Sequence, residues 1–370
     1  MVSQVPTNRT LDLRVTDGHL VSMSQDKRSL GSDNHSGIHP RMLEAITQAN
    51  AGHAHSYGKD DWTQRADKLF RATFGDRTKN FYVFNGTAAN VLAIDALVRS
   101  HQSVLCAQSS HLWQDECGAP QRLVGCQLIP IQTDNGKLTP RTIEDHLVRL
   151  GDQHASQPAA FSITQPTELG TLYTLDELTA LGECAKRHGL KFHMDGARIT
   201  NAAAALNCSL AQTTFEVGVD ALSFGGTKHG LLHCEAVVLK NKDLAQAFKF
   251  RRKQAMQLPS KTRFMAAQFI AFLEENLWRD IANHANGMAN LLRHESSRFP
   301  ELTFPHPTQA SAVFAKIPKA WLKPLREMRF FYVWDPETML VRWSLGFDTT
   351  RDDIKAPCDT LASLSAAGVR

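Results

Sequence analysis

Residues 175–198, which read LDELTALGECAKRHGLKFHMDGAR, join a helix directly to a strand. Leu175 to His188 is predicted to be helical, and Gly189 stands where the C-terminus of a helix favours glycine. The next run, Leu190 to Met194, is short and apolar, as is typical of a buried strand. This stretch therefore predicts an α/β layer fold with a carboxylate, Asp195, directly after a strand.

The same alternation extends to both sides of this stretch. Helical segments such as Arg41 to Ala49, Trp62 to Phe74 and Ala88 to Ser100 are separated by short runs rich in apolar and β-branched residues. The predicted strands are Phe81–Phe84, Val104–Ala107, Cys126–Ile131, Ala159–Ile163, Leu190–Met194, Ala221–Phe224 and Glu235–Leu239. Seven such runs with helices between them predict a mostly parallel sheet.

The length of the chain, 370 residues, predicts two domains. Residues 1–45 are expected to form an N-terminal arm, because the first thirty or so residues have few periodic apolar positions. Residues 46–270 are expected to form the large domain. A long helical region from Thr262 to Phe299 leads into a smaller α+β domain at residues 271–370.

Composition argues against several classes of function. The 41 Lys and Arg and 37 Asp and Glu give a net charge of +4 that is scattered along the chain, so nucleic acid is not expected as a partner. Apolar runs such as Cys234 to Leu239 are too short to cross a bilayer, and Met1 to Thr10 does not resemble a signal peptide. The seven cysteines have no CxxC spacing, which indicates reduced thiols in the cytoplasm and no metal site.

Ligands of open α/β sheets lie beyond the carboxyl ends of the strands, and four places there carry suitable residues. The first, Asn85 to Asn90, opens a predicted helix. Gly86 permits a tight turn, and free N–H groups together with the Thr87 hydroxyl could hold a phosphate dianion. Taken alone, the motif is equally an ordinary helix start capped by Thr87.

Two further places hold Asp195 with Arg198, and Lys228. A carboxylate bonded to a pyridine nitrogen keeps that nitrogen protonated, which makes the ring an electron sink. Lys228 lies between glycine-containing turns, where a desolvated amine could attack an aldehyde. Taken alone, Asp195 could be a helix cap with Arg198 as a nearby ion-pair partner, and Lys228 could be a solvated loop lysine. In this order, a phosphate turn, an aspartate and a lysine match the needs of one cofactor, pyridoxal phosphate (PLP).

The fourth place is the segment from His111 to Pro120, after the strand predicted at Val104 to Ala107. His111 could stack on the exposed face of a cofactor ring, and Glu116 could position the helix or the base. An ordinary surface histidine is the alternative interpretation.

Six motifs together resemble one known family. They are GSDNHSG (31–37), NGTAAN (85–90), HLWQDECGAP (111–120), ITQPTELG (163–170), DGAR (195–198) and SFGGTK (223–228). From about Leu30 to about Asp352 the chain resembles the threonine aldolase family, of the low-specificity or phenylserine aldolase type. The resemblance implies a fold-type-I PLP enzyme.

The resemblance implies roles toward the cofactor. Lys228 would form the internal Schiff base, and Asp195 would be the partner of the pyridine nitrogen. Gly86 and Thr87 would bind the phosphate, and His111 would stack on the ring.

It also implies roles toward an amino-acid substrate. Arg198 would lie near the ring phenolate and the substrate. Ser32, next to Asp33, and Arg342 would bind the substrate carboxylate, Arg342 with two hydrogen bonds. Arg263 matches another arginine of the family, although its local motif differs.

The sequence departs from the family at Thr167-Glu168, where many members have a Thr-His pair. The group that takes the proton of the substrate hydroxyl is therefore open: His111, a water molecule or Glu168 could serve. Many relatives have asparagine where this chain has His229, and nothing mechanistic follows from that difference.

The activity implied by the resemblance is cleavage of a β-hydroxy-α-amino acid, such as L-threonine, L-allo-threonine or L-phenylserine, to glycine and an aldehyde. Another PLP reaction, namely β-elimination, racemisation or glycine hydroxymethyl transfer, is the alternative, and a non-catalytic assembly protein is a third. The resemblance also implies a homo-oligomer, either a dimer or a tetramer.

Overall fold

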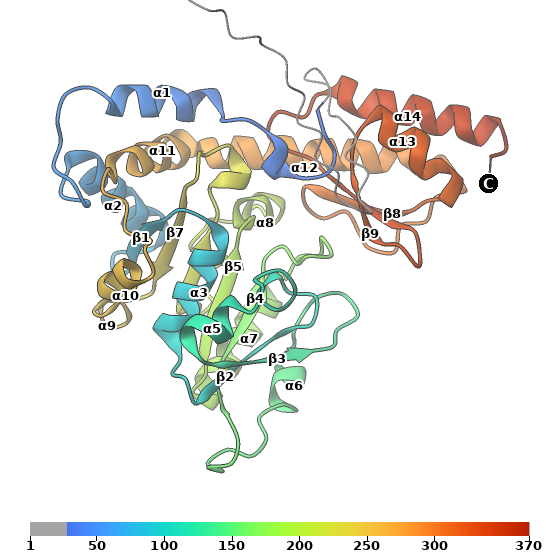
Figure 1. Cartoon of the computed structure of the whole chain (residues 1–370). Coiled ribbons are helices and arrows are strands. Elements are labelled where there is room, and N and C mark those ends of the chain that lie inside the picture. The colour runs from blue at the N-terminus through green and yellow to red at the C-terminus, as the bar shows by residue number, and fades with distance from the viewer. Residues whose placement is uncertain (1–27, 370) are drawn as a thin grey trace, which may run out of the picture.

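Seven strands form one sheet in the computed structural model, which describes residues 28–369 (Figure 1). They are β1 (Lys79–Val83), β2 (Gln102–Ala107), β3 (Gln127–Ile131), β4 (Gln157–Thr164), β5 (Lys191–Gly196), β6 (Ala221–Phe224) and β7 (Glu235–Leu239). Their spatial order is β1-β7-β6-β5-β4-β2-β3. Only β7 runs against its neighbours, so the prediction of a mostly parallel seven-stranded sheet is confirmed.

Helices cover both faces of this sheet. One face carries α3 (Gly86–Leu97), α5 (Ala119–Val124), α9 (Lys242–Ala245) and α10 (Phe248–Gln254). The other carries α2 (Asp61–Phe74), α7 (Leu175–His188), α8 (Ile199–Ala205) and α11 (Arg263–Leu273). Successive residues of a strand point to opposite faces, so Phe192 and Met194 of β5 join the core under α2 and α11. His193 and Asp195 of the same strand accordingly face α3.

The long helical region predicted from Thr262 to Phe299 is interrupted in the structure. α11 ends at Leu273, a short 3-10 turn (Glu274–Asn276) follows, and α12 (Leu277–Ser296) begins afresh. Glu275 and Asn276 adopt φ angles of 53° and 58°, which no right-handed helix tolerates. The region is therefore helical, as predicted, but two residues in the left-handed region divide it into two helices.

A smaller unit follows α12, which leads across the molecule toward it (Figure 1). It contains an antiparallel sheet in the order β8-β10-β9, formed by β8 (Ala312–Lys316), β9 (Tyr332–Asp335) and β10 (Leu340–Ser344). Together with α12, helices α13 (Leu322–Met328) and α14 (Arg351–Ala366) cover it. Trp321, Phe331 and Trp343 are buried in this second core.

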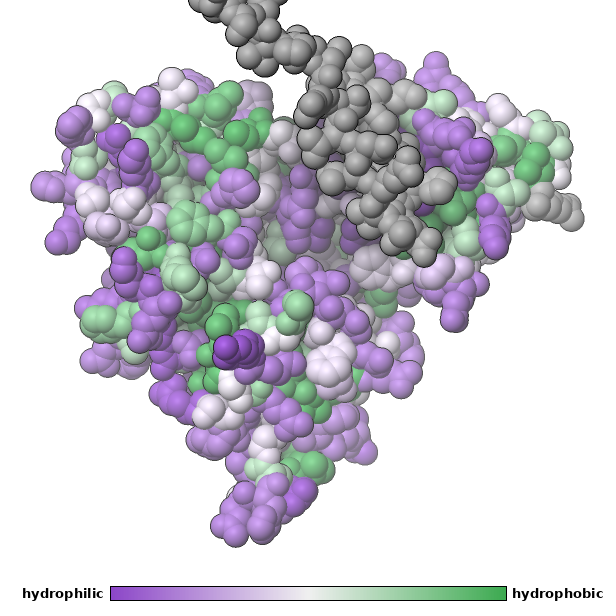
Figure 2. All heavy atoms as spheres, viewed as in Figure 1, coloured by the Kyte–Doolittle hydropathy of each residue, from purple (hydrophilic) through white to green (hydrophobic). Residues whose placement is uncertain are grey.

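The remaining helices complete the chain. α1 (Pro40–Ala49) packs on α11, and Figure 2 shows apolar side chains gathered on this face over the region of these two helices. The short helices α4 (His111–Gln114) and α6 (Pro140–Glu144) lie in connections between strands. Most of the arm predicted for residues 1–45, namely residues 1–27, lies outside the described residues. Within residues 28–369, no helix combines the length and the hydropathy that a bilayer span needs.

The register of the large sheet brings three strand ends together. Thr164 of β4 pairs with Asp195 of β5, and Asp195 pairs with Ser223 of β6. The segments that follow these strands therefore leave the sheet side by side at its carboxyl edge, where a ligand site is expected.

Candidate active site

A cavity of about 270 Å³ lies at this carboxyl edge of the sheet. Segments far apart in the sequence line it: the first turn of α3, the start of α4, the end of β5 and the segment after β6. Six of the residues predicted from the sequence are brought together there, namely Gly86, Thr87, His111, Asp195, Arg198 and Lys228.

The first turn of α3 has the features of an anion site. Asn85 caps the helix, because its side chain accepts a hydrogen bond of 2.9 Å from the N–H of Ala88. The alternative interpretation of Thr87 as the cap is therefore wrong, and the Thr87 hydroxyl bonds to no residue in the range 28–369. The backbone of Gly86 is helical rather than left-handed, so the turn does not require a glycine for its φ angle. What Gly86 provides is open space at the start of the helix, since a Cβ there would meet no atom within 4 Å. Free N–H groups at a helix start favour a phosphate.

Asp195 is buried and held from two sides. Its Oδ1 accepts a hydrogen bond of 2.9 Å from the N–H of Ala197, and its Oδ2 accepts one of 2.8 Å from Asn90 Nδ2. Burial alone would raise the pKa of this carboxyl, but the charges of Lys228 and His111 and these hydrogen bonds hold it below its ordinary value. Asp195 is thus ionised at neutral pH, as a partner of a protonated ring nitrogen must be.

Asn90 is a site residue to which the sequence analysis gave no role. It lies on the buried face of α3 and donates a second hydrogen bond, of 2.9 Å, to Glu116 Oε1. The same oxygen of Glu116 lies 2.9 Å from His111 Nδ1, and this contact raises the pKa of His111 above its ordinary value. The sequence did hold a signal for this role: Asn90 is a polar residue among the apolar residues of α3, and a buried amide needs hydrogen-bond partners.

Close backbone contacts shape the segment before Lys228. A Cβ on Gly225 would lie 2.2 Å from the carbonyl oxygen of Ala197, and one on Gly226 would lie 2.2 Å from that of Cys234. Glu235 at the start of β7 then fixes the segment, since its Oε2 accepts a hydrogen bond of 2.6 Å from the N–H of Gly226. Both positions therefore require glycine, because there is no space for a Cβ atom.

The Lys228 amine is prepared for reaction by its surroundings. Burial first, and the nearby charge of Arg198 second, lower the pKa of Lys228 below its ordinary value. No hydrogen bond or ion pair ties the amine to another residue between 28 and 369. The lowered pKa makes the neutral amine, which is the form that attacks an aldehyde, easier to reach.

Arg198 is held by Asp33 in a fork of two hydrogen bonds. Its Nε and Nη2 atoms donate to the two carboxylate oxygens over 2.5 and 2.8 Å. Although burial opposes it, the charge of Arg198 holds the pKa of Asp33 at about 2. The orientation of Arg198 in the cavity is thus set by a residue from the beginning of the described chain.

A second cavity of about 260 Å³ adjoins the first, and His111, Glu168, Arg198 and Lys228 line both. Ser32 and Arg342 lie in the second cavity, as does Trp334.

Arg342 is positioned from β10 without an acidic partner. Its Nη2 donates to the carbonyl oxygen of Gly31 over 3.2 Å, and its guanidinium lies 5.0 Å from the centre of the Trp334 ring. It forms no ion pair within the described part of the chain, so it remains available to an anion. Ser32 caps a short 3-10 turn (Asp33–His35) by accepting a hydrogen bond of 3.1 Å from Asn34.

Arg263 lines neither cavity. Its Nη1 instead donates to the carbonyl oxygen of Gly52 over 3.2 Å, at the start of α11. Its predicted match to a family arginine stays a prediction.

The first cavity fits PLP on three counts. The open first turn of α3 suits a phosphate, the ionised Asp195 suits a protonated pyridine nitrogen, and the unengaged Lys228 amine suits an aldehyde. The second cavity, whose Arg342 has no acidic partner among residues 28–369, suits the carboxylate of an amino acid.

Comparison with known proteins gives a consistent result. The model of the beta-eliminating lyase family matches residues 29–319. The low specificity L-threonine aldolase of Pseudomonas aeruginosa is 41% identical over 334 residues, covering 86% of this chain and 96% of that protein. The low specificity L-threonine aldolase of Saccharomyces cerevisiae is 27% identical, covering 88% and 83%. A solved structure of Leishmania major threonine aldolase superposes with a TM-score of 0.87 at 25% identity, covering 91% and 99%.

Proposed function

Since this chain belongs to the beta-eliminating lyase family, and within it to the threonine aldolases, we propose that it cleaves β-hydroxy-α-amino acids to glycine and an aldehyde. L-Threonine, L-allo-threonine and L-phenylserine are the substrates to examine first. The observation that carries this function is the shared boundary of the two cavities. It joins Lys228 to Arg342, an arginine that forms no ion pair within the described part of the chain.

PLP is the cofactor that these residues would hold. Lys228 would bind its aldehyde, Asp195 its ring nitrogen, and the first turn of α3 with Thr87 its phosphate, while His111 would cover the ring. When bound, PLP supplies an electron-withdrawing ring that stabilises negative charge at the α-carbon of the substrate. The fit of three chemically different groups in one cavity supports this assignment.

The protein's own residues would select the bond that breaks. Arg342 would grip the substrate carboxylate, helped by Ser32, and thereby fix the rotation of the groups on the α-carbon. This grip would decide which bond of the α-carbon is placed to break, here the bond to the β-carbon. Arg198, fixed by Asp33, would keep a positive charge beside the ring oxygen and the substrate.

Product analysis tests this function against the other PLP reactions. The purified protein, supplied with PLP, is incubated separately with the three substrates, and glycine and the matching aldehyde are quantified. Equal amounts of both products are expected, because aldol cleavage yields one of each. Formation of an oxo acid with ammonia, or of the D-amino acid alone, would instead indicate elimination or racemisation and refute the proposal.

We also propose that the chain forms a homo-oligomer, a dimer or a tetramer. Large apolar side chains left exposed in the single chain support this, namely Tyr57, Phe84, Leu232, Phe250 and Met256. Phe84 also lines the first cavity, so a second copy covering it would close the site. Light scattering coupled to size-exclusion chromatography tests the assembly, and a monomer at micromolar concentration would refute it.

A further inference from the structure

Glu168 lies where the two cavities meet. It lines both the cavity of Lys228 and Asp195 and the cavity of Arg342. An amino acid joined to the cofactor through its amino group and gripped by Arg342 through its carboxylate must place its α-carbon at this boundary, with the β-carbon bonded directly to it. Glu168 is therefore close to the place where the bond between those carbons would break.

The two oxygens of the Glu168 carboxyl group have different surroundings. Its Oε1 accepts a hydrogen bond of 2.7 Å from the N–H of His111 and another of 2.7 Å from the Thr164 hydroxyl. Its Oε2 is buried and has no hydrogen-bond partner among residues 28–369. A buried carboxyl oxygen without a donor is costly, which indicates that a group absent from the chain itself, such as a substrate hydroxyl, completes the site.

The other ionisable groups at the boundary are committed elsewhere. Arg198 stays protonated and is bound to Asp33 through two hydrogen bonds. The amine of Lys228 is needed for the cofactor, and His111 is held at Nδ1 by Glu116. Glu168 is the one carboxyl group that lines both cavities in the described part of the chain.

We propose that Glu168 is the catalytic base that removes the proton from the β-hydroxyl group of the substrate. The inference rests on the proposed aldol cleavage. In this step the hydroxyl O–H bond breaks, the carboxylate takes the proton, and the β-carbon forms a C=O bond as the bond to the α-carbon breaks. The electron pair of that bond stays on the glycine fragment, whose α-carbon takes up a proton before release, and Glu168 returns its own proton to solvent.

The electrostatic surroundings of Glu168 suit this work. Burial raises the pKa of Glu168 above its ordinary value, although the hydrogen bonds from His111 and Thr164 act in the opposite direction. A carboxyl group whose pKa is raised binds a proton more strongly than an ordinary glutamate does, and is therefore a stronger base.

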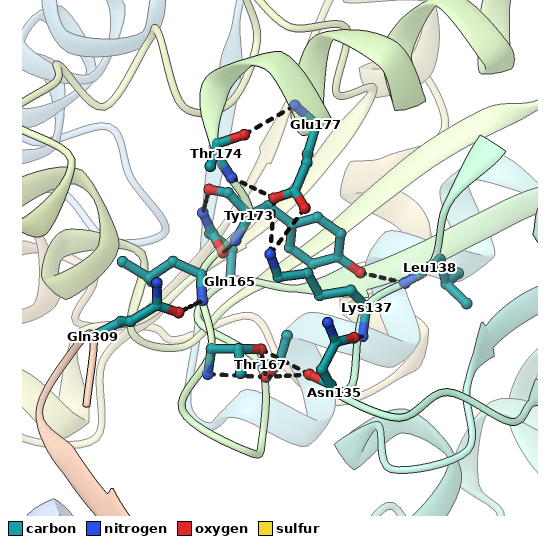
Figure 3. Close-up of polar contacts among 11 residues, drawn as sticks. Asn135, Lys137, Leu138, Gln165, Thr167, Tyr173, Thr174, Glu177 and Gln309 are labelled. Atoms are coloured by element: carbon teal, nitrogen blue, oxygen red, sulfur yellow. Dashed lines mark hydrogen bonds and ion pairs between the residues drawn. The ribbon is translucent and has the colours of Figure 1, made fainter. Parts of the chain in front are cut away.

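The segment that carries Glu168 is fixed by a network of polar contacts (Figure 3). Gln165 bonds to the backbone of Tyr173 through both its amide nitrogen and its amide oxygen, over 2.9 and 3.0 Å. The hydroxyls of Thr167 and Thr171 lie 2.7 Å apart, and Thr171 donates to the carbonyl oxygen of Asn135. Glu168 is thus presented by a loop braced on both sides, as a precisely acting base requires.

Further along, the same network ties this loop to both units. Gln309, which precedes β8, accepts a hydrogen bond of 2.9 Å from the N–H of Leu172. Lys137 forms an ion pair of 2.8 Å with Glu177 at the start of α7 (Figure 3). The position of Glu168 is therefore fixed from the large sheet and from the small one.

Glu168→Gln tests the proposal, because the amide keeps an oxygen that can accept both existing hydrogen bonds but cannot take a proton. Two rates of the PLP-loaded enzyme are compared: cleavage of L-threonine, and exchange of an α-hydrogen of glycine in D₂O followed by NMR. Glycine has no β-hydroxyl group. Cleavage is expected to fall ~10²–10⁴-fold, the usual contribution of a general base, and exchange to change less than about threefold.

Two further readouts separate catalysis from structure. The acid limb of the pH profile for cleavage should disappear in Glu168→Gln and remain in Glu168→Asp, which keeps a carboxylate at lower efficiency. In the protein without PLP, the infrared band of a protonated carboxyl group should persist to a higher pH than in Glu168→Gln. Glu183→Gln, an exposed glutamate of α7, is the matched control and should leave every readout unchanged.

Each other outcome is decisive. Cleavage by Glu168→Gln within a few fold of the wild-type rate, or an intact acid limb, would overturn the assignment and favour His111 or water. An equal loss of cleavage and exchange would assign Glu168 a positioning role only. If the wild-type enzyme exchanges the glycine hydrogen but releases no aldehyde from any of the three substrates, the proposed function itself fails.

Discussion

Asn90 Nδ2 donates a hydrogen bond to Asp195 Oδ2 over 2.8 Å, from the middle of α3 to the end of β5. Its second hydrogen goes to Glu116, which in turn contacts His111. One amide thus links the proposed partner of the ring nitrogen to the residue proposed to cover the ring. This link makes the alignment of His111 and Asp195 depend on a helix buried against the sheet.

Asn90→Ala is expected to destabilise the protein by about 1–3 kcal/mol, because two buried carboxylates each lose a donor. Binding of PLP should weaken as well, since Asp195 would no longer be held in place. Urea unfolding and PLP titration measure the two effects. Asn80→Ala removes an amide that bonds Asp67 outside both cavities, so it should cost stability without weakening PLP binding. Unchanged PLP affinity in Asn90→Ala would contradict the positioning role.

Lys228→Ala is expected to abolish covalent attachment of PLP and nearly all turnover, because no other lysine lines either cavity in the described chain. Borohydride reduction followed by mass spectrometry should locate the cofactor on Lys228 in the wild type and find none in the variant. Lys240→Ala, which removes a half-exposed lysine near Asp220, serves as the control and should keep the modification. Normal turnover by Lys228→Ala would refute the scheme.

Arg342→Lys should raise the KM for L-threonine about 10- to 100-fold, corresponding to the roughly 1.5–3 kcal/mol of a charged hydrogen bond. Lysine keeps the charge but cannot form the two-pronged contact with a carboxylate. The value of kcat should fall less than kcat/KM. Steady-state kinetics measure both, with Arg279→Lys, whose guanidinium bonds to Cys208 outside the cavities, as the control. A KM equal to that of the wild type would exclude Arg342 from the carboxylate site.

The free energy of unfolding is expected to decrease as the pH is lowered, because two histidines are buried in the folded protein. Burial, the largest cause in each, lowers the pKa of His193 and of His229 to about 4, whereas an unfolded histidine titrates near 6.5. Between these values the unfolded chain binds protons that the folded chain does not, so the free energy of unfolding decreases as the pH falls from about 6.5 to about 4.

Urea unfolding of the protein without PLP, measured from pH 4 to pH 8, tests this dependence. His229→Gln should show a shallower slope than the wild type, because one of the two histidines no longer contributes. A wild-type stability that is flat across this range would contradict the prediction.

Local patterns were sufficient to predict most of the large sheet. All seven predicted strands are present, each with its ends shifted by at most a few residues, because apolar runs flanked by turn residues define buried strands. The break between α11 and α12 was not predicted, because Glu275 carries no local signal for a left-handed backbone and Asn276 adopts it only occasionally. Likewise, the cap of α3 is Asn85 rather than Thr87, a difference of two residues in where the helix begins.

By itself, the sequence determined the fold class and the residue types of the site, since strand ends, glycine turns and the order of Asp195 and Lys228 are local features. Only the tertiary structure decided which side chains meet. The pairing of Asp33 with Arg198 and the placement of Arg342 beside Gly31 join residues more than a hundred positions apart. Burial, which sets the pKa of Glu168, is likewise a property of the packed chain. Hydrogen bonds and desolvation depend on distances in space, which the order of residues along the chain does not specify.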